Sequence, residues 1–159
     1  MKELIKRELG RLNMDARKYF LSDGAWSLFE LVDFCLDRLP PSGLFITSFS
    51  LSEESVRHLL HLKETGRIVS LKGLFDPSLR KTKTPLLYFA AEVFDHIRFT
   101  PNHSKIILFD NPDHPATILA SANLGRNRRL ECGVIDTTRQ TFDFYSSKLQ
   151  SLFENATPL

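Results

Sequence analysis

The pattern of apolar and polar residues predicts helices at the start of the chain. In residues 1–20 the apolar side chains recur at helical spacing between charged ones, which is typical of an amphipathic helix. Residues 22–39 begin with two potential capping side chains, Ser22 and Asp23, and continue as a largely apolar run that Pro40 ends. We therefore expect residues 1–40 to consist of helices.

The next part of the chain alternates between strand and helix patterns. The stretches 43–50 and 67–75 are rich in β-branched and aromatic residues, which indicates buried strands. The segment between them opens with Ser50 and Glu53 at capping-box spacing and closes at Gly66, so it is predicted to be a helix. A strand, a helix and a strand in succession predict a parallel pair with a right-handed crossover.

The second half of the chain predicts further strands and a closing helix. Residues 76–85 are polar and basic and are expected to form a loop, followed by a helix to residue 97 and a short strand to residue 100. Strands are then predicted over 103–110, 116–121 and 131–136, and an amphipathic helix closes the chain. The turn NPDHP between the first two of these strands indicates a hairpin. This order predicts an α/β fold with a mixed β-sheet flanked by helices on both faces.

Length and composition limit the number of domains, the kinds of partner and the cellular location that we expect. A chain of 159 residues with 42% apolar residues can bury one core, so we expect one domain over 1–159 with its core in 43–136. The net charge of +2 does not by itself favour a nucleic-acid or membrane partner. Cys35 and Cys132 lie in apolar contexts and are expected to be reduced core thiols. The charged N-terminus does not resemble a signal peptide and no stretch is long enough to span a membrane, so we expect a cytoplasmic protein without membrane insertion.

Five polar residues near the predicted hairpin form a candidate site. His103 and Lys105 are two apart on a predicted strand and so point to the same face. The next strand ends in Ser121 and Asn123, which hairpin pairing brings close, and Glu131 opens the strand after that. An ammonium, a hydroxyl, an amide and an imidazole suit a phosphoryl group, with the histidine as nucleophile and the carboxylate orienting its ring.

These residues resemble a known signature. The stretch HSKIILFD fits the His-x-Lys-x4-Asp pattern of the phospholipase D superfamily, with Asp110 as its last residue. The stretch ASANLGRN resembles the Gly-Ser-x-Asn element of that family, with Ala120 in place of the glycine, and LECGVI is similar to the strand that carries a glutamate in its small nucleases. The resemblance covers residues 101–136, extends back to residue 43, and departs from the family by a longer turn in the hairpin.

The resemblance implies a reaction and an assembly. Family members cleave phosphodiesters in two steps, in which one histidine attacks phosphorus to form a phosphohistidine and a second histidine protonates the leaving oxygen. This chain has one copy of the signature, so the resemblance implies a homodimer in which the two His103 side chains face each other. No metal and no other cofactor is expected. Single-signature members are mostly nucleases, so the expected substrate is DNA or RNA and the expected activity is that of an endonuclease.

Two basic runs flank the candidate site and are expected to bind a phosphate backbone. They contain Arg80, Lys81 and Lys83 in one run and Arg126, Arg128 and Arg129 in the other. Such runs also occur as solvated loops with no ligand, and that alternative stays open.

Three other functions also stay open. The fold could serve a catalytically weak nucleic-acid-binding dimer, since a fold does not fix a function. A phospholipid hydrolase is the second alternative, although the loops near the candidate site are basic and polar. A metal site could use His58 and His61, or residues among His96, His103, Asp110, Asp113 and His114, but neither group has a recognised ligand spacing. Asp110 is expected to hold the hairpin turn through its side chain.

Overall fold

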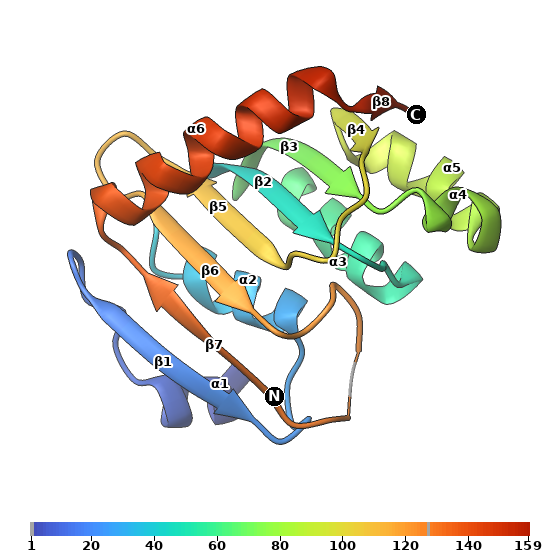
Figure 1. The fold of residues 1–159 in the computed structure, drawn as a ribbon. Coiled ribbons are helices and arrows are strands. Elements are labelled where there is room, and N and C mark those ends of the chain that lie inside the picture. Colours follow the sequence, from blue (N-terminus) through green and yellow to red (C-terminus); the bar gives the residue numbers. More distant parts are fainter. Residues whose placement is uncertain (1, 127) are drawn as a thin grey trace.

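The computed structural model describes residues 2–126 and 128–159, and its central feature is one mixed β-sheet (Figure 1). The sheet has eight strands in the order β1-β7-β6-β5-β2-β3-β4-β8. The strands are β1 (Arg17–Ser22), β2 (Ser42–Ser48), β3 (Ile68–Phe75), β4 (His96–Phe99), β5 (Ile106–Asp110), β6 (Ala116–Ala120), β7 (Glu131–Asp136) and β8 (Thr157–Pro158). The helices are α1 (Lys2–Leu9), α2 (Leu28–Leu36), α3 (Glu53–Glu64), α4 (Ser78–Thr82), α5 (Thr84–Val93) and α6 (Arg139–Asn155).

Helices cover both faces of this sheet, which confirms the predicted α/β class. Helices α1, α2, α3 and α5 share the larger core on one face, whereas α6 lies on the other (Figure 1). Strands β2, β3 and β4 are parallel neighbours, and the remaining pairs in the sheet are antiparallel. The predicted parallel pair joined by a helix is therefore confirmed as β2–α3–β3, and the predicted hairpin as β5–β6.

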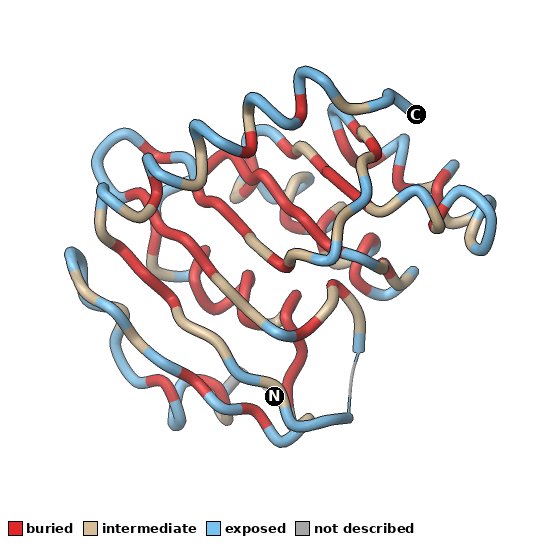
Figure 2. Tube along the Cα trace, viewed as in Figure 1, coloured by how far each residue is buried: buried red, intermediate tan, exposed pale blue. Residues whose placement is uncertain are grey.

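The sheet separates two hydrophobic cores because successive strand residues point to opposite faces. On β5, Ile107 and Phe109 belong to the larger core beneath α2 and α3. Leu108 between them belongs to the smaller core, where Phe142 and Phe153 of α6 cover it. The buried residues run along the central strands, whereas β1 at the edge of the sheet is largely exposed (Figure 2).

The prediction of a helix over residues 1–20 is wrong in its second half. Helix α1 ends at Leu9, and Gly10 follows with a positive φ of 64°, a conformation that glycine adopts without strain. The chain then forms β1, which pairs with β7 at the edge of the sheet. Helix α2 begins after Ser27, whose backbone N–H donates to the Glu30 carboxylate at 2.7 Å, and not after Ser22 and Asp23.

The structure also corrects the predicted start of α3, the predicted loop over 76–85 and the predicted burial of Cys132. The N-terminal cap of α3 is Ser52, whose hydroxyl accepts from the Ser55 backbone N–H at 3.1 Å, so the predicted box of Ser50 and Glu53 does not form. The predicted loop over 76–85 contains α4 and the start of α5. Cys35 is buried as predicted, but Cys132 is exposed because it faces away from the larger core.

Asp136, at the end of β7, joins β1 to the start of α6 and makes the stability of the fold depend on pH. Its carboxylate accepts hydrogen bonds from Arg17 Nε (2.7 Å), the Thr138 backbone N–H (2.8 Å) and the Thr141 hydroxyl (2.8 Å). Burial acts to raise the pKa of Asp136, but bonds from Thr138, Arg17 and Thr141 outweigh it and hold the pKa at about 2. A carboxyl pKa that is lower in the folded state stabilises the fold above the usual aspartate pKa and stops doing so as pH falls toward 2.

We expect Asp136→Asn to lower the free energy of unfolding at pH 7 by roughly 2 kcal/mol, because the folded protein holds the pKa of this carboxyl at about 2, well below its usual value. The difference from wild type is expected to shrink as pH falls from about 5 to about 2, because the wild-type carboxylate is then protonated. Urea unfolding across this pH range measures the effect, with Asp143→Asn on the exposed side of α6 as the control. A difference between wild type and Asp136→Asn that stays constant with pH would contradict this origin.

Candidate active site

The segment that follows β4, residues 100–105, crosses the ends of the parallel strands β2 and β3. Asn102 fixes it there, because its Nδ2 donates to the carbonyl oxygens of Ser48 (3.3 Å) and Leu74 (3.1 Å). Its backbone N–H donates to Asp76 Oδ2 at 3.1 Å. Hydrogen bonds from Ser78 and, more weakly, from Asn102 hold the pKa of Asp76 below its usual range. Ligands of open α/β sheets bind at the carboxyl ends of strands, so this segment lies where a site is expected.

The strand predicted over 103–110 begins later than expected, at Ile106, so His103 precedes it. The cause is an Asx turn, in which Asn102 Oδ1 accepts from the Ser104 backbone N–H at 2.9 Å and bends the chain. Asn102 is absent from the predicted site, although an asparagine two residues before a serine is a usable signal for such a turn. The correction moves His103 out of the sheet and onto its exposed end.

Lys105 lies against His103 and is nearly buried. Its Nζ is 3.0 Å from His103 Nδ1 and donates to the His103 carbonyl oxygen at 2.7 Å, while only 8% of the residue is exposed. The His103 ring is exposed and contacts Phe49, with the ring centroids 5.2 Å apart. Burial lowers the pKa of Lys105, and the attraction of Glu131 opposes that shift. Because little water reaches the Lys105 ammonium, its positive charge is poorly screened. It would therefore interact strongly with a negative charge bound next to the imidazole.

Ser121 and Glu131, at the neighbouring ends of β6 and β7, lie in contact next to the start of β5. The Ala120 backbone N–H donates to the Lys105 carbonyl oxygen at 3.0 Å, which sets the end of β6 beside the lysine. The Ser121 hydroxyl donates to Glu131 Oε2 and accepts from the Cys132 backbone N–H at 3.0 Å. In the structure Glu131 thus contacts the serine, and its expected role in orienting His103 stays a prediction.

The loop after β6 is tied to the start of α3. Leu124 donates its backbone N–H to the Ser48 hydroxyl at 3.0 Å, and its carbonyl accepts from the Ser52 backbone N–H at 3.1 Å and the Ser55 hydroxyl at 2.9 Å. Asn123, one residue earlier, accepts a longer contact from the Ser48 hydroxyl at 3.5 Å. The loop therefore holds Asn123 next to the ends of β2 and β6, and the catalytic roles of all five predicted residues stay predictions.

Several of the predicted phosphate-binding residues have partners within the chain. Arg126 bonds the Glu54 carboxylate, with Nη2 2.6 Å from Oε1, and Lys83 Nζ donates to the Leu51 carbonyl oxygen at 2.6 Å. Arg80 donates to the Pro158 carbonyl oxygen, and its guanidinium lies 4.3 Å from the centroid of the Phe99 ring. The side chains of Lys81, Arg128 and Arg129 are exposed. Binding of a phosphate backbone by these six residues stays a prediction.

Asp110 lies at the other end of β5 from His103, and the turn next to it is held by a different residue. Asn111 Oδ1 accepts from the backbone N–H groups of Asp113 (3.1 Å) and His114 (3.3 Å). The side-chain role in the hairpin turn that was expected of Asp110 therefore falls to Asn111.

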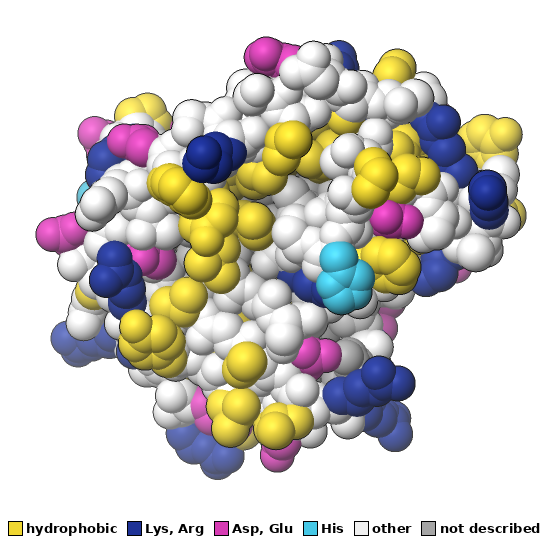
Figure 3. Space-filling model, in the orientation of Figure 1, with side chains coloured by type: hydrophobic (Ala, Val, Ile, Leu, Met, Phe, Trp, Pro, Cys, Tyr) yellow, Lys and Arg dark blue, Asp and Glu magenta, His cyan; other side chains and the backbone are white. Residues whose placement is uncertain are grey.

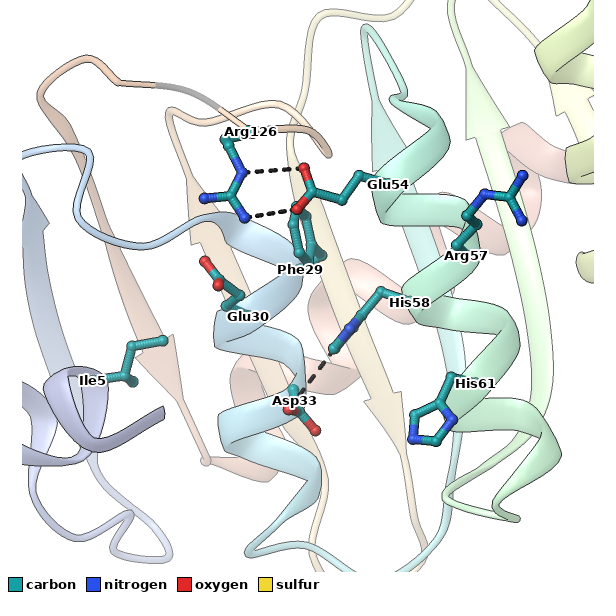
Figure 4. Close-up of a pocket in the computed structure, with 9 residues that line it drawn as sticks. All are labelled: Ile5, Phe29, Glu30, Asp33, Glu54, Arg57, His58, His61 and Arg126. Carbon is teal, nitrogen blue, oxygen red and sulfur yellow. Dashed lines mark hydrogen bonds and ion pairs between the residues drawn. The ribbon is translucent and has the colours of Figure 1, made fainter. Parts of the chain in front are cut away.

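A cavity of about 400 Å³ lies on the other side of the sheet, against α1, α2 and α3 (Figure 4). It includes His58 and His61, which were considered as metal ligands, and His58 Nε2 is 3.8 Å from the buried Asp33 carboxylate. Asp33 also accepts from Arg67 Nη1 at 2.5 Å. Over residues 2–126 and 128–159, no three histidine, cysteine or acidic side chains are grouped so that they could hold a metal ion. Every helix within residues 2–126 and 128–159 is too short or too polar to span a membrane.

Comparison with solved structures identifies the fold. No protein-family model matches the sequence, and a search of curated proteins finds no match. The chain superimposes on Nuc from Salmonella typhimurium, a phospholipase D family member, with a TM-score of 0.72 at 15% identity, over 91% of this chain and 97% of Nuc. It superimposes on NucT from Helicobacter pylori with a TM-score of 0.69 at 13% identity, over 91% of this chain and all (100%) of NucT.

A third similar structure has a different description. TrmBL2, an archaeal chromatin protein with a novel mode of DNA binding, matches with a TM-score of 0.57 at 12% identity, over 99% of this chain and 58% of that protein. The two more similar structures match over nearly their whole lengths and confirm the resemblance inferred from residues 101–136 at the level of the fold. The chain therefore has the fold of the phospholipase D family.

Proposed function

We propose that this chain is a cytoplasmic, metal-independent phosphodiesterase of one domain that acts as an endonuclease on DNA or RNA. The observation that carries the proposal is Lys105, a nearly buried cation that lies 3.0 Å from the His103 ring. The Glu131 carboxylate attracts Lys105, and a bound phosphate would bring further negative charge next to the buried ammonium. The hydroxyl of Ser121 at the same end of the hairpin would donate to a phosphate oxygen.

The proposed reaction has two steps and uses two subunits. An imidazole nitrogen of His103 forms a bond to phosphorus while the bond from phosphorus to the leaving oxygen breaks, and His103 of the partner subunit gives its proton to that oxygen. The same histidine of the partner subunit then takes a proton from water, whose oxygen attacks phosphorus and breaks the phosphorus–nitrogen bond. Lys105 stabilises the negative charge that develops on the phosphoryl oxygens in both steps.

Nucleic acid is the favoured substrate because of the charge around the site. The loop after Asn123 carries Arg126, Arg128 and Arg129, and cationic side chains beside a phosphodiester site favour a polyanionic backbone. The likeness to TrmBL2, described as binding DNA, also supports this choice. A non-catalytic nucleic-acid-binding dimer is the second candidate, supported by the same two observations.

The test is cleavage of end-labelled single-stranded DNA, duplex DNA and RNA in the presence of EDTA. Cleavage of at least one substrate is the expected result. Binding without cleavage, seen as retarded DNA in a gel, would overturn the enzyme and support the binding module. Release of a headgroup from phospholipid vesicles with no cleavage of nucleic acid would instead support a phospholipid hydrolase.

Glu131→Gln is expected to lower kcat about 10- to 100-fold, the usual effect of removing a charge that orients the reacting groups. The carboxylate accepts from the Ser121 hydroxyl and attracts Lys105, and a neutral amide does neither as well. Steady-state cleavage kinetics measure the effect, with Glu64→Gln at the exposed end of α3 as the matched control. Equal kcat values for the two variants would show that the Glu131 carboxylate has no role in catalysis.

A further inference from the structure

A groove of about 630 Å³ lies between the first turns of α3 and α5. Its apolar part comes from α5, and its basic part comes from α3 and from the residue that precedes α5. We call the surface made by five of its side chains the α3–α5 groove: Arg57, Lys83, Pro85, Leu86 and Phe89. A groove of this volume can hold a ligand of the size of a nucleotide.

The α3–α5 groove begins beside the candidate active site. Helices α3 and α4 follow the carboxyl ends of β2 and β3, and α5 follows α4 directly, so α3 and α5 begin at the end of the sheet where His103 lies (Figure 1). Phe49 contacts the His103 ring, and two residues later the Leu51 carbonyl oxygen accepts from Lys83 Nζ at 2.6 Å. Two residues span at most about 7 Å, so the groove opens close to the imidazole.

The surface between the imidazole and the groove combines apolar and basic side chains. Figure 3 shows a histidine near the centre of this side of the molecule, with hydrophobic side chains directly beside it and lysine or arginine side chains further out. A polyanion with flat apolar groups, such as a nucleic-acid strand, matches both kinds of side chain. An acyl chain or an apolar peptide would have no use for the cations Arg57 and Lys83.

The contacts within the groove suit a base and its phosphate. The Arg57 guanidinium lies 5.2 Å from the centroid of the half-buried Phe89 ring. Glu53 accepts from Arg57 Nε at 2.9 Å and Nη2 at 2.6 Å, which holds the guanidinium near the ring. Nucleobases stack on aromatic rings and on guanidinium planes. An ammonium has three donors, so Lys83 can bind Leu51 and a phosphate together.

We infer that the α3–α5 groove binds an unpaired nucleobase of the substrate, next to the phosphate that is held at His103. The inference rests on the proposed function, because a base site in this position serves a nucleic-acid substrate. A base within a duplex is paired and stacked, and it has to leave the stack to enter the groove. Phe89 is then the residue that distinguishes a base from a bare sugar-phosphate backbone, and the groove favours single-stranded over duplex substrates.

The test is fluorescence anisotropy of labelled oligothymidylate and of an abasic oligonucleotide of the same length, with the full chain carrying His103→Ala so that neither is cleaved. Phe89→Leu in this background is expected to weaken binding of oligothymidylate about 5- to 100-fold, the scale of one lost stacking contact. Binding of the abasic oligonucleotide is expected to stay the same. Leucine keeps an apolar side chain against the core on which Phe89 packs, so the fold is expected to survive.

Two further variants serve as controls. Tyr88→Leu removes the neighbouring aromatic side chain of α5, which is 72% exposed and lies outside the groove, and is expected to bind oligothymidylate as tightly as the parent protein. Phe89→Tyr keeps an aromatic ring and is expected to do the same. Either result supports a role for the ring of Phe89 itself.

The outcomes that overturn the inference differ from those that overturn the proposed function. Equal binding of oligothymidylate by Phe89→Leu and Tyr88→Leu would exclude a base site in the groove and leave the proposed nuclease intact. The same would follow if Phe89→Leu weakened binding of both oligonucleotides equally. Binding of oligothymidylate that depends on Phe89, in a wild-type protein that cleaves no nucleic acid in EDTA, would keep the base site and overturn the enzyme.

Discussion

His103→Ala is expected to lower the rate of phosphodiester cleavage at least about a thousandfold, the scale of loss seen when a nucleophile is removed. The variant has no nitrogen to bond to phosphorus, and in the proposed dimer it also has no group to protonate the leaving oxygen. The fold is expected to survive, because the His103 side chain is exposed and its segment is held by Asn102. The measurement is kcat/KM for cleavage in EDTA, together with retention of labelled DNA in a gel.

The matched control for this experiment is His114→Ala, which removes an exposed histidine from the turn between β5 and β6. Wild-type cleavage by this control and unchanged DNA retention by His103→Ala would assign the loss to chemistry. Full activity of His103→Ala would exclude this histidine as the nucleophile. Loss of both cleavage and DNA retention would point to a general effect on the site.

Lys105→Met is expected to lower kcat/KM about 100- to 1,000-fold, as for the loss of one preorganised group that stabilises transition-state charge. Methionine keeps much of the apolar stem but has no ammonium to set against a phosphoryl oxygen. The free energy of unfolding is expected to stay the same or rise, because burying a charge costs stability that a buried methionine does not. A large loss of rate with no loss of stability is the signature that separates a catalytic lysine from a structural one.

The pH profile gives a second measure of the same residue. Burial lowers the pKa of Lys105, so its ammonium is lost as pH rises, before a fully solvated lysine would lose its own. Wild-type kcat/KM is therefore expected to fall on the alkaline side below the usual lysine range. Lys148→Met, on the exposed surface of α6, is the matched control and is expected to cleave at the wild-type rate. A Lys105→Met variant as fast as this control would contradict the proposed role.

The sequence was sufficient for the features that depend on local pattern. The apolar runs of β2, β3, β5 and β6 and the helices between them follow from period and composition. The predicted hairpin was enough to expect that the end of β6 lies beside Lys105, because hairpin pairing fixes which residues are neighbours, and the Ala120 backbone N–H donates to the Lys105 carbonyl oxygen.

The features that depend on distant contacts could not be predicted in this way. Strand β1 forms because it pairs with β7, more than a hundred residues away in the sequence, and the alternation of Tyr19 and Leu21 with Phe20 is too short to outweigh the helical pattern before it. The start of β5 depends on Asn102, whose side chain reaches the carbonyl oxygens of two other strands.

The most direct test of the central claim is to trap the covalent intermediate on His103. Wild-type protein is mixed with excess substrate in EDTA, quenched in base within the first turnover, and digested for mass spectrometry, because a phosphorus–nitrogen bond survives base better than acid. We expect a phosphoryl-linked fragment of the substrate on the peptide that contains His103, and none on the same peptide of His103→Ala. Cleavage that proceeds in EDTA with the adduct on another residue, or with no adduct on the His103 peptide at any time in the first turnover, would contradict the proposed mechanism.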